Sequence, residues 1–500
     1  MDLMMGLVFV AALLLATLFL RRQKNLPPGY FAVPLLGSLS LLSKLKNKKT
    51  HLVLLEESKK LGSVFRFSIG NRLIVVLSGY DTIHEALVVK KEAFSGRPNL
   101  SNPAISNVFD DEMRRGGIIL RPYGDGWRNT RRFTLQALRD FGVGKSSIEE
   151  KLNEELNAVT SYLDSFNGKP ASIRNVMQKA VTNVIFSIVF GKRYDYDDTE
   201  FDEVQNMTNT IVTGSGVVNP NNFLPSFMAR ILNRKETEND KLREKSFRGM
   251  RDYVYEQIDE HENTYDESNI RDFVDFYIQA SRRESTDNKH FISKPHMFRI
   301  IFDLFIAGSE TTSTSLLWAF LCLIEFPDVQ KRCREEITKV LGGKPVQYSD
   351  KNNLPYINAV ITETQRFGNI LPLNVIHSTT KDTTLHGYNI PQDTLVIPFL
   401  YSVSLDEKYF PEPTKFNPDR FIDSNGKLIR NDAAIPFSTG PRSCLGEPLA
   451  RMELFMVVAN LLQKFVFERE DPEICHSFDI VPNQVTISPL PYKLRATRIQ

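Results

Sequence analysis

The chain has 500 residues, and 42% of them are hydrophobic, which suffices for a large core and argues against a disordered protein. Its formal net charge of +2 argues against a nucleic-acid-binding protein that relies on overall charge. The four cysteines show no CxxC spacing, so neither a disulfide scaffold nor a zinc site is indicated, and a reducing compartment fits.

The first segment of the chain predicts a membrane anchor. Residues 3–20 are apolar or small throughout, which is about the length that a helix needs to cross a bilayer. Arg21, Arg22 and Lys24 follow, so the positive-inside rule places the body of the protein on the cytoplasmic side. A cleaved signal peptide would carry its positive charge before the apolar run, so we expect residues 1–20 to remain as an uncleaved anchor.

Residues 21–50 predict a basic, proline-rich hinge between the anchor and the body. Pro27, Pro28 and Pro34 exclude helix and stiffen this segment. The lysine-rich run at 44–49 is interpreted as a solvated face, with contact to anionic headgroups as the alternative. No repeat or further linker follows, so we expect residues 51–500 to form one large domain.

The body of the chain is mostly helical in pattern. Residues 64–77 alternate around Gly70-Asn71, which predicts a β-hairpin. Helices are expected where apolar residues recur at i, i+3 and i+4, at 148–166, 173–190 and 241–261. A loop is expected at 217–225, and two short strands around a turn are expected at 388–391 and 395–398. The fold class is therefore mainly α with small peripheral β-sheets.

Residues 300–326 are the most apolar helix candidate in the body, and Pro327 ends it. In its middle, Gly308 weakens the helix, and the Thr311 hydroxyl can bond back to the carbonyl of Ala307, which together could open a bulge. Such a groove would admit a small ligand, and Glu310 with Thr311 could pass protons. Taken alone, a threonine in an apolar helix is more often an ordinary core residue.

The stretch from Phe437 to Gly446 holds one cysteine between two glycines, before a helix candidate at 449–465. Gly440 and Gly446 allow a tight turn and close approach to something flat. Arg442 could neutralise an anion, and Cys444 near a helix start favours a thiolate, a ligand for a soft, redox-active metal. A lone cysteine would otherwise be interpreted as a buried structural residue.

This stretch, Phe-x-x-Gly-x-Arg-x-Cys-x-Gly, resembles the haem-binding loop of the cytochrome P-450 (haem-thiolate monooxygenase) family. The resemblance implies haem b, with Cys444 as the axial iron ligand, Arg442 facing a propionate and Phe437 packing near the sulfur. Residues 307–311 are similar to the family's oxygen-activating segment. There Thr311 would hold dioxygen in a hydrogen bond, and Glu310 would link to the proton supply.

Two further pairs of residues match this family. Glu363 and Arg366, alone an ordinary i, i+3 ion pair, resemble its Glu-x-x-Arg motif, which Arg420 would complete as structural support for the haem loop. Trp127 and Arg131 resemble its Trp-x-x-x-Arg motif at a propionate, although a basic helix could also be merely solvated. Arg97 and His377 resemble two further propionate contacts of its microsomal members.

The resemblance covers residues 26–500 and is nearest to animal microsomal members of family 2. It implies a cytochrome P-450 fold in the endoplasmic reticulum membrane, with the catalytic domain on the cytoplasmic side. It also implies insertion of one oxygen atom from O2 into a lipophilic small molecule, such as a xenobiotic, steroid or fatty acid. By family position, the substrate pocket would be lined by Ile105, Phe109, Ile118, Phe305, Ala307, Thr311, Ile370, Leu371 and Val375.

The electrons for this reaction must come from a partner protein, because the sequence has no nicotinamide or flavin motif. The resemblance implies an NADPH-dependent flavoprotein reductase, with cytochrome b5 as a second partner. A docking surface could be formed by Arg128, Arg132, Arg139 and Lys145. Two alternatives remain open: a membrane-tethered haem protein that only binds or senses ligands, and a haem-thiolate isomerase that acts on peroxides.

Overall fold

The computed structural model describes residues 25–33, 36–98, 113, 116–142, 146–212, 238–283, 293–481 and 486–499. The predicted anchor at 1–20, the predicted loop at 217–225, Lys145 and the pocket candidates Ile105 and Phe109 lie outside the described residues. Within the described ranges, no helix has both the length and the apolar character that a bilayer crossing requires.

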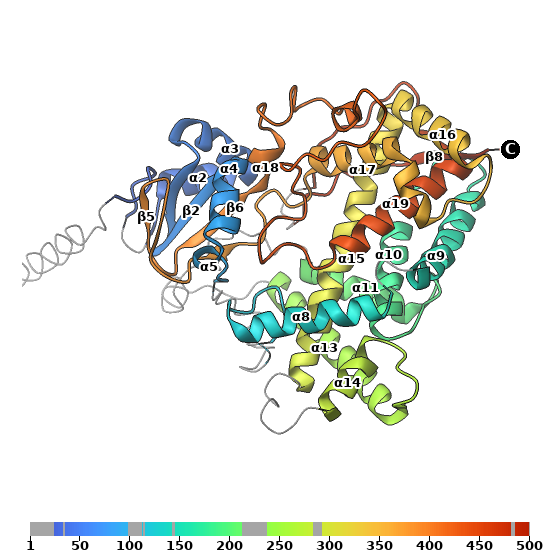
Figure 1. Cartoon of the computed structure of the whole chain (residues 1–500), viewed down its shortest axis with the longest axis horizontal. Coiled ribbons are helices and arrows are strands. Elements are labelled where there is room, and N and C mark those ends of the chain that lie inside the picture. The colour runs from blue at the N-terminus through green and yellow to red at the C-terminus, as the bar shows by residue number, and fades with distance from the viewer. Residues whose placement is uncertain are drawn as a thin grey trace, which may run out of the picture.

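The helical part of the molecule is built around α15 (Lys294–Glu325), which runs through its centre (Figure 1). Pro327 opens the next helix, α16 (Pro327–Leu341), so the predicted helix end is confirmed. Helices α10 (Arg174–Val189), α17 (Pro355–Gly368) and α19 (Glu447–Lys464) pack around α15, and α9 (Ser146–Ser165) packs against α10 and α19. The helices predicted at 148–166, 173–190 and 449–465 are thus confirmed as α9, α10 and α19. The core is therefore mainly α, as the pattern predicted.

The remaining helices cover this centre and its flanks. The longer ones are α3 (Thr50–Leu61), α8 (Asp125–Asp140), α11 (Thr199–Val212), α13 (Glu238–Thr264) and α14 (Phe273–Arg283). The shorter ones are α2 (Leu39–Asn47), α4 (Tyr80–His84), α5 (Lys91–Phe94) and α18 (Leu400–Ser404), with a π-helical turn at Glu85–Val89 and 3₁₀ turns at Tyr348–Asn353 and Pro418–Phe421. Helix α13 contains the predicted helix at 241–261.

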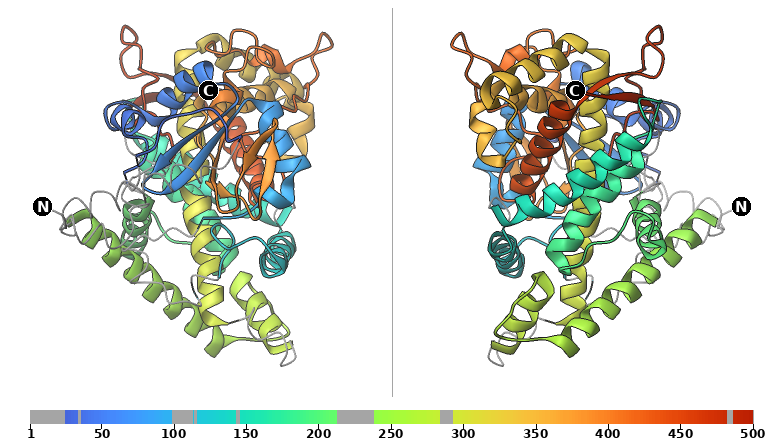
Figure 2. Two further views of the ribbon diagram at one scale, coloured as in Figure 1. Left: turned by 90° about the vertical axis from the view of Figure 1, so that its left-hand side faces the viewer. Right: turned by 90° about the vertical axis from the view of Figure 1, so that its right-hand side faces the viewer.

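A four-stranded sheet lies at the other end of the molecule from α9, α10 and α16 (Figures 1 and 2). Its order is β1-β2-β6-β3, with β1 (Val64–Ile69) antiparallel to β2 (Arg72–Ser78), β2 parallel to β6 (Leu395–Phe399) and β6 antiparallel to β3 (His377–Ser378). The turn between β1 and β2 is Gly70-Asn71, with Gly70 at φ 57°, so the predicted hairpin is confirmed.

The two strands predicted around residue 392 do not pair with each other. Tyr388–Ile390 forms β5 and pairs with β4 (Thr383–Leu385), whereas β6 pairs with β2, more than 300 residues earlier. Both predicted strands are confirmed, but their partners are decided by tertiary packing, which a local pattern does not contain. A third sheet pairs β7 (Phe465–Arg469) with β8 (Leu494–Arg498).

The described part of residues 25–50 packs against β1. Gly29 bridges to Arg66, and the side chain of Leu41 is fully buried. In the basic run, Lys44 Nζ lies 2.7 Å from Glu57 Oε1, and Lys49 Nζ lies 2.9 Å from Asp479 Oδ1. These lysines are therefore ion-paired with the body as well as solvated.

Gly308 lets α10 approach α15 closely. A Cβ atom at this residue would lie 2.6 Å from Cδ1 of Ile185 on α10. The helix itself stays α-helical through residues 307–312, so the predicted bulge is absent. The glycine is needed for helix packing rather than for a break in the helix.

Glu453 is a buried carboxyl group at the contact between α19 and α15. Burial raises its pKa to about 8, against an opposing hydrogen bond with Thr312 on α15, and Oε1 has no hydrogen-bond partner. The folded protein therefore keeps this proton at pH values where an unfolded glutamate has lost it. Between about pH 4.5 and pH 8, rising pH should destabilise the fold through this residue.

We therefore expect the wild type to lose stability relative to Glu453→Gln as the pH rises from 5 to 8, because glutamine has no proton to lose. The difference in the free energy of unfolding should grow by on the order of 1 kcal/mol per pH unit. Urea unfolding at several pH values measures it, with the exposed Glu468→Gln on β7 as the matched control. A difference that does not change with pH would contradict the buried neutral acid.

Candidate functional site

Cys444 lies in a tight loop that leads directly into α19. Its backbone N–H donates to the carbonyl of Phe437 at 2.9 Å, and the N–H of Ser443 donates to Gly440 at 3.1 Å. Ser438 and Gly440 have φ values of 63° and 78°, in the left-handed region, so the chain reverses sharply before the cysteine. The cysteine is thus fixed by the backbone near a helix N-terminus.

The thiol of Cys444 is surrounded by protein on most sides, but part of the side chain is exposed. Burial raises its pKa, while backbone N–H groups of Gly446 and Glu447 donate to the sulfur and, together with the charge of Arg131, act in the opposite direction. Its side chain nevertheless keeps exposed surface. A metal that displaced the proton would find a sulfur already oriented by backbone donors and a cation.

Gly440 makes the tight turn that the sequence predicted, with φ at 78°. A Cβ atom at Gly440 would lie 2.1 Å from the carbonyl oxygen of Leu87, so this glycine also lets the loop pass the π-helical turn. At Gly446 a Cβ atom would lie 3.9 Å from Cys444 Sγ, so this glycine adjoins the sulfur.

The predicted propionate contacts on α8 and in the cysteine loop donate to main-chain carbonyls, and Arg442 and Trp127 share that of Ile118. Arg442 donates to Ser95 O (3.0 Å), Ile118 O (3.1 Å) and Arg121 O (2.7 Å), and Trp127 Nε1 also donates to Ile118 O (3.2 Å). The Arg442 guanidinium lies 4.1 Å from the centroid of the Trp127 ring. Arg131 donates to Ser443 O at 2.8 Å, which ties α8 to the cysteine loop.

The other two predicted contacts lie at the edge of the sheet. Arg97 donates to the carbonyls of Ile119 (2.9 Å), Val375 (3.0 Å) and Ile376 (2.9 Å). His377 Nδ1 donates a hydrogen bond to the carbonyl of Phe94 at 2.7 Å, and the buried Nε2 has no hydrogen-bond partner. We refer to Arg97, Trp127, Arg131, His377 and Arg442 as the cationic cradle.

The cationic cradle contains positive charge without a matching anion. No carboxylate among the described residues pairs with Arg97, Arg131 or Arg442. Burial, followed by the charge of Arg131, lowers the pKa of Arg442 to about 9, and burial with Arg97 lowers the pKa of His377 well below its usual range. An anionic ligand would relieve this crowding, so the residues fit the two propionate groups of haem.

On the central helix, Thr311 and Glu310 bond to different partners. The Thr311 hydroxyl donates to the carbonyl of Ala307 at 2.7 Å, so this predicted bond is confirmed. The Glu310 carboxylate accepts from the hydroxyls of Thr314 and Thr486, both at Oε1 and both at 3.2 Å. Burial raises the pKa of Glu310, and these two bonds together with Arg174 act in the opposite direction.

One face of α15 is open where the sequence predicted a groove. Ala307 has exposed surface and Thr311 is half-buried, although most of this helix is buried. Phe305 lies on the opposite face, since two residues rotate a helix by about 200°. Its ring packs against Phe186 and Phe190 on α10, at centroid distances of 4.7 and 5.6 Å. Its assignment to the substrate pocket was therefore wrong.

The other described pocket candidates lie in two loops beside the cationic cradle. Ile370, Leu371 and Val375 are half-buried, and the segment they belong to is tied to the cysteine loop by a 2.8 Å bond from Asn374 Nδ2 to Ser438 Oγ. Ile118 is buried in the second loop. In each loop, residues that are pocket candidates lie beside or carry the carbonyls to which the cationic cradle donates.

Sequence reasoning missed the residue that holds the Ile118 loop. Asp303 on α15 accepts from the N–H groups of Ile118 (2.6 Å) and Ile119 (2.9 Å) at the same carboxylate oxygen. Arg299 pairs with its other oxygen at 2.9 Å, and both side chains are buried. A carboxylate in so apolar a helix was the available signal, because such a group needs a buried partner.

Glu363, Arg366 and Arg420 form the predicted network. Arg366 binds Glu363 with two nitrogens, at 2.6 and 2.7 Å, and Arg420 Nε donates to Glu363 Oε1 at 3.1 Å. All three side chains are buried. The network is charge-assisted and holds the main chain around it, since Arg366 also donates to carbonyls of Ser404, Pro413 and Lys415.

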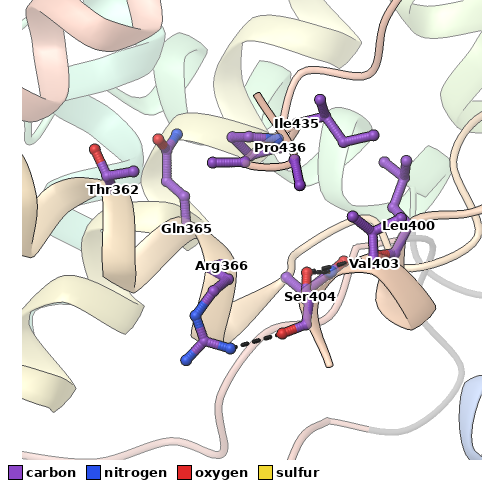
Figure 3. A pocket seen from close by; sticks show the side chains of 11 residues that line it. Thr362, Gln365, Arg366, Leu400, Val403, Ser404, Ile435 and Pro436 are labelled. Carbon is purple, nitrogen blue, oxygen red and sulfur yellow. Dashed lines mark hydrogen bonds between the residues drawn. The ribbon is translucent and has the colours of Figure 1, made fainter. Parts of the chain in front are cut away.

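A small pocket adjoins this network (Figure 3). Arg366 and Ser404 line it from one side and Ile435 and Pro436, just before the cysteine loop, from another. No predicted haem or substrate contact lines it. It belongs to the structural support behind the cysteine loop rather than to the reaction site.

Comparison with known proteins agrees with these features. The sequence model of the family described as Cytochrome P450 matches residues 27–496. Cytochrome P450 2B19 of Mus musculus is 36% identical over 473 residues, which are 94% of this chain and 93% of the relative. Cytochrome P450 2B4 of Oryctolagus cuniculus is 36% identical over 502 residues, 99% of each chain, and cytochrome P450 2J2 of Homo sapiens is 35% identical over 496 residues, 98% and 95%. The chain belongs to the cytochrome P450 family, resembles its animal family 2 members, and is thus a monooxygenase that binds haem b.

Proposed function

We propose that this protein inserts one oxygen atom from dioxygen into a lipophilic small molecule, with Cys444 as the axial ligand of haem b. The observation that carries the proposal is the cationic cradle, whose buried charges lack an anion, tied through Arg131 to the loop of Cys444. The backbone donors at the sulfur support a thiolate at this position. Haem b supplies the redox chemistry that activates dioxygen.

The protein side chains would hold the cofactor, deliver protons to the oxygen and bind the substrate. Arg97, Arg131, Trp127, His377 and Arg442 would fix the cofactor through its carboxylates. Thr311 would turn its hydroxyl from the carbonyl of Ala307 to the oxygen that is being reduced, and Glu310 would resupply the proton. The half-buried Ile370, Leu371 and Val375 would bind the apolar part of the substrate.

Turnover with 18O2 tests this function. The protein, an NADPH-dependent flavoprotein reductase and a panel of one steroid, one fatty acid and one apolar xenobiotic should give a product that carries one 18O atom. Thr311→Val should lower the ratio of product to NADPH consumed and raise the release of peroxide. The exposed Thr338→Val on α16, whose hydroxyl bonds its own helix, is the matched control.

Two outcomes would overturn the proposal. Rearrangement of a hydroperoxide itself, with no oxygen inserted into a second substrate and no 18O-labelled product when reductase and 18O2 are supplied, would indicate an isomerase. Spectral binding of the same compounds with no product under any condition would indicate a ligand-binding haem protein.

We propose that the protein lies at the endoplasmic reticulum membrane, with residues 1–20 as its anchor, residues 21–50 as its hinge and the body on the cytoplasmic side. We further propose that the electron donor binds at α8. The reductase, with cytochrome b5 as a second donor, would meet exposed arginines on the helix that also carries Trp127 and Arg131. Arg128 is exposed and pairs with Asp125 at 2.8 Å, and Arg132 is exposed and bonds to Asn129 at 3.3 Å. A solvated ion pair and a solvated hydrogen bond of this kind are weak, so both arginines stay available to an acidic partner.

Charge reversal at Arg128 and Arg132 should therefore slow reductase-driven turnover, by about tenfold at low salt. Hydroperoxide-driven turnover should stay unchanged, because it needs no partner. Arg430→Glu, at an exposed arginine in a surface turn, is the matched control. Unchanged reductase kinetics in the double variant would exclude α8 as the docking surface.

A further inference from the structure

The carboxyl group of Glu310 is held by a segment that precedes β8. Its Oε1 atom accepts from Thr314, one turn later on α15, and from Thr486. The Thr486 side chain is buried, so its hydroxyl is committed to this contact. Two hydroxyl donors on one oxygen, from two different elements, fix the direction in which the carboxyl group points.

Residues 486–489, here called the C-terminal clasp, are anchored on three sides. Trp318 Nε1 on α15 donates to the carbonyl of Ile487 at 2.9 Å. The N–H of Ile487 donates to the carbonyl of Ile370 at 2.7 Å. The third anchor is Arg174 at the start of α10, which donates to Ser488 Oγ and to the carbonyl of Pro489, both at 2.8 Å.

Arg174 acts on Glu310 by its charge as well as through the C-terminal clasp. Its guanidinium favours the ionised form of Glu310, and Glu310 in turn favours the charged form of Arg174. The other titratable group that acts on Arg174 is Tyr492, whose hydroxyl donates to the carbonyl of Leu317 at 2.7 Å. Among the described residues, Arg174 is the cation that acts on this carboxyl group.

We propose that Thr486 and Arg174 are positioning residues that hold the Glu310 carboxyl group in the proton supply to Thr311. This inference rests on the proposed monooxygenase function and extends it to two residues outside the predicted haem and substrate contacts. Because the C-terminal clasp also bonds the backbone of Ile370, substrate contact at Ile370 is mechanically linked to the orientation of the acid.

An infrared pH titration of the resting, haem-loaded protein tests this inference without turnover. The band of the protonated carboxyl group is identified as the one that Glu310→Gln removes. Thr486→Val removes a donor to the carboxylate, so the midpoint of this band should move to higher pH, and Thr486→Ser should restore it. Arg174→Gln should move the midpoint in the same direction, and Arg174→Lys should keep it near the wild-type value.

Turnover gives the second measurement. In Thr486→Val and Arg174→Gln the pH profile of the ratio of product to NADPH consumed should shift with the infrared midpoint, while substrate affinity stays the same. The matched controls are Thr210→Val, an exposed hydroxyl on α11 that bonds its own helix, and Arg495→Gln on β8, which donates to main-chain carbonyls elsewhere.

Different results would overturn the proposed function and the positioning role of Thr486 and Arg174. A wild-type protein without a thiolate-type carbon monoxide band would overturn the proposed function. Normal haem and normal oxygen insertion, with an infrared midpoint that neither Thr486→Val nor Arg174→Gln moves, would overturn the role of these two residues alone. If Thr486→Val loses haem, Thr486→Ser and the two Arg174 variants decide the question.

Discussion

Cys444→Ser is expected to abolish the strongly red-shifted Soret band of the reduced carbon monoxide complex. A serine hydroxyl keeps the size and the loop geometry, including the bond from residue 444 N–H to the carbonyl of Phe437. It does not replace a soft thiolate as an iron ligand, because a hydroxyl stays protonated near neutral pH. The loss of the band should be complete, and monooxygenase turnover should fall to background.

Cys475→Ser provides the matched control for this measurement. Cys475 is the other cysteine with exposed surface in the described part of the chain, so its replacement tests for a general effect of a lost thiol. It should leave the spectrum unchanged. A wild-type band typical of histidine ligation, or an unaltered band in Cys444→Ser, would remove Cys444 as the axial ligand.

The second large effect is expected at Arg366. Arg366→Met leaves the Glu363 carboxylate buried and removes all five hydrogen bonds that Arg366 donates, two to this carboxylate and three to main-chain carbonyls. Breaking a buried ion pair in this way costs about 3–5 kcal/mol, a large part of the 5–15 kcal/mol that stabilises a typical fold. We expect little or no haem-loaded protein at 37 °C, measured as carbon monoxide spectrum per purified protein.

Arg332→Met is the control for the loss of an arginine that binds a carboxylate. Arg332 binds Asp419 with two nitrogens, at 2.7 and 2.8 Å, but both side chains are about half exposed. Its removal should cost no more than about 1 kcal/mol and leave the haem content near that of the wild type. Equal haem content in Arg366→Met and Arg332→Met would mean that the buried network does not support the haem loop.

Periodic features of the sequence predicted the helices and the hairpin, because these depend on neighbours in the chain. The end of α15 before Pro327 and the turn at Gly70-Asn71 are examples. The partner of β6 was missed because β2 lies far away in sequence and meets it only after folding. Phe305 was misplaced although the helical period was known, since its family position was used in place of its angle around α15.

The site residues were predicted by resemblance to known motifs, and the physical reasons for them emerge from the structure. The sequence contains Arg97, Arg131 and Arg442 but not the fact that each donates to main-chain carbonyls and lacks a carboxylate partner. The tight turn at Gly440 was predicted, but its close neighbour Leu87 comes from another part of the chain and was not. Thr486 was visible only through its contacts, whereas Asp303 had a signal as a carboxylate in an apolar helix.

The cationic cradle makes the cofactor a counter-ion as well as a catalyst. A chain that folds before it acquires haem must bring several positive groups together with nothing to neutralise them, so that state is disfavoured by repulsion. A ligand that binds only the folded chain stabilises it by mass action. Haem supply should therefore set how much of this protein survives in a cell, before any substrate is present.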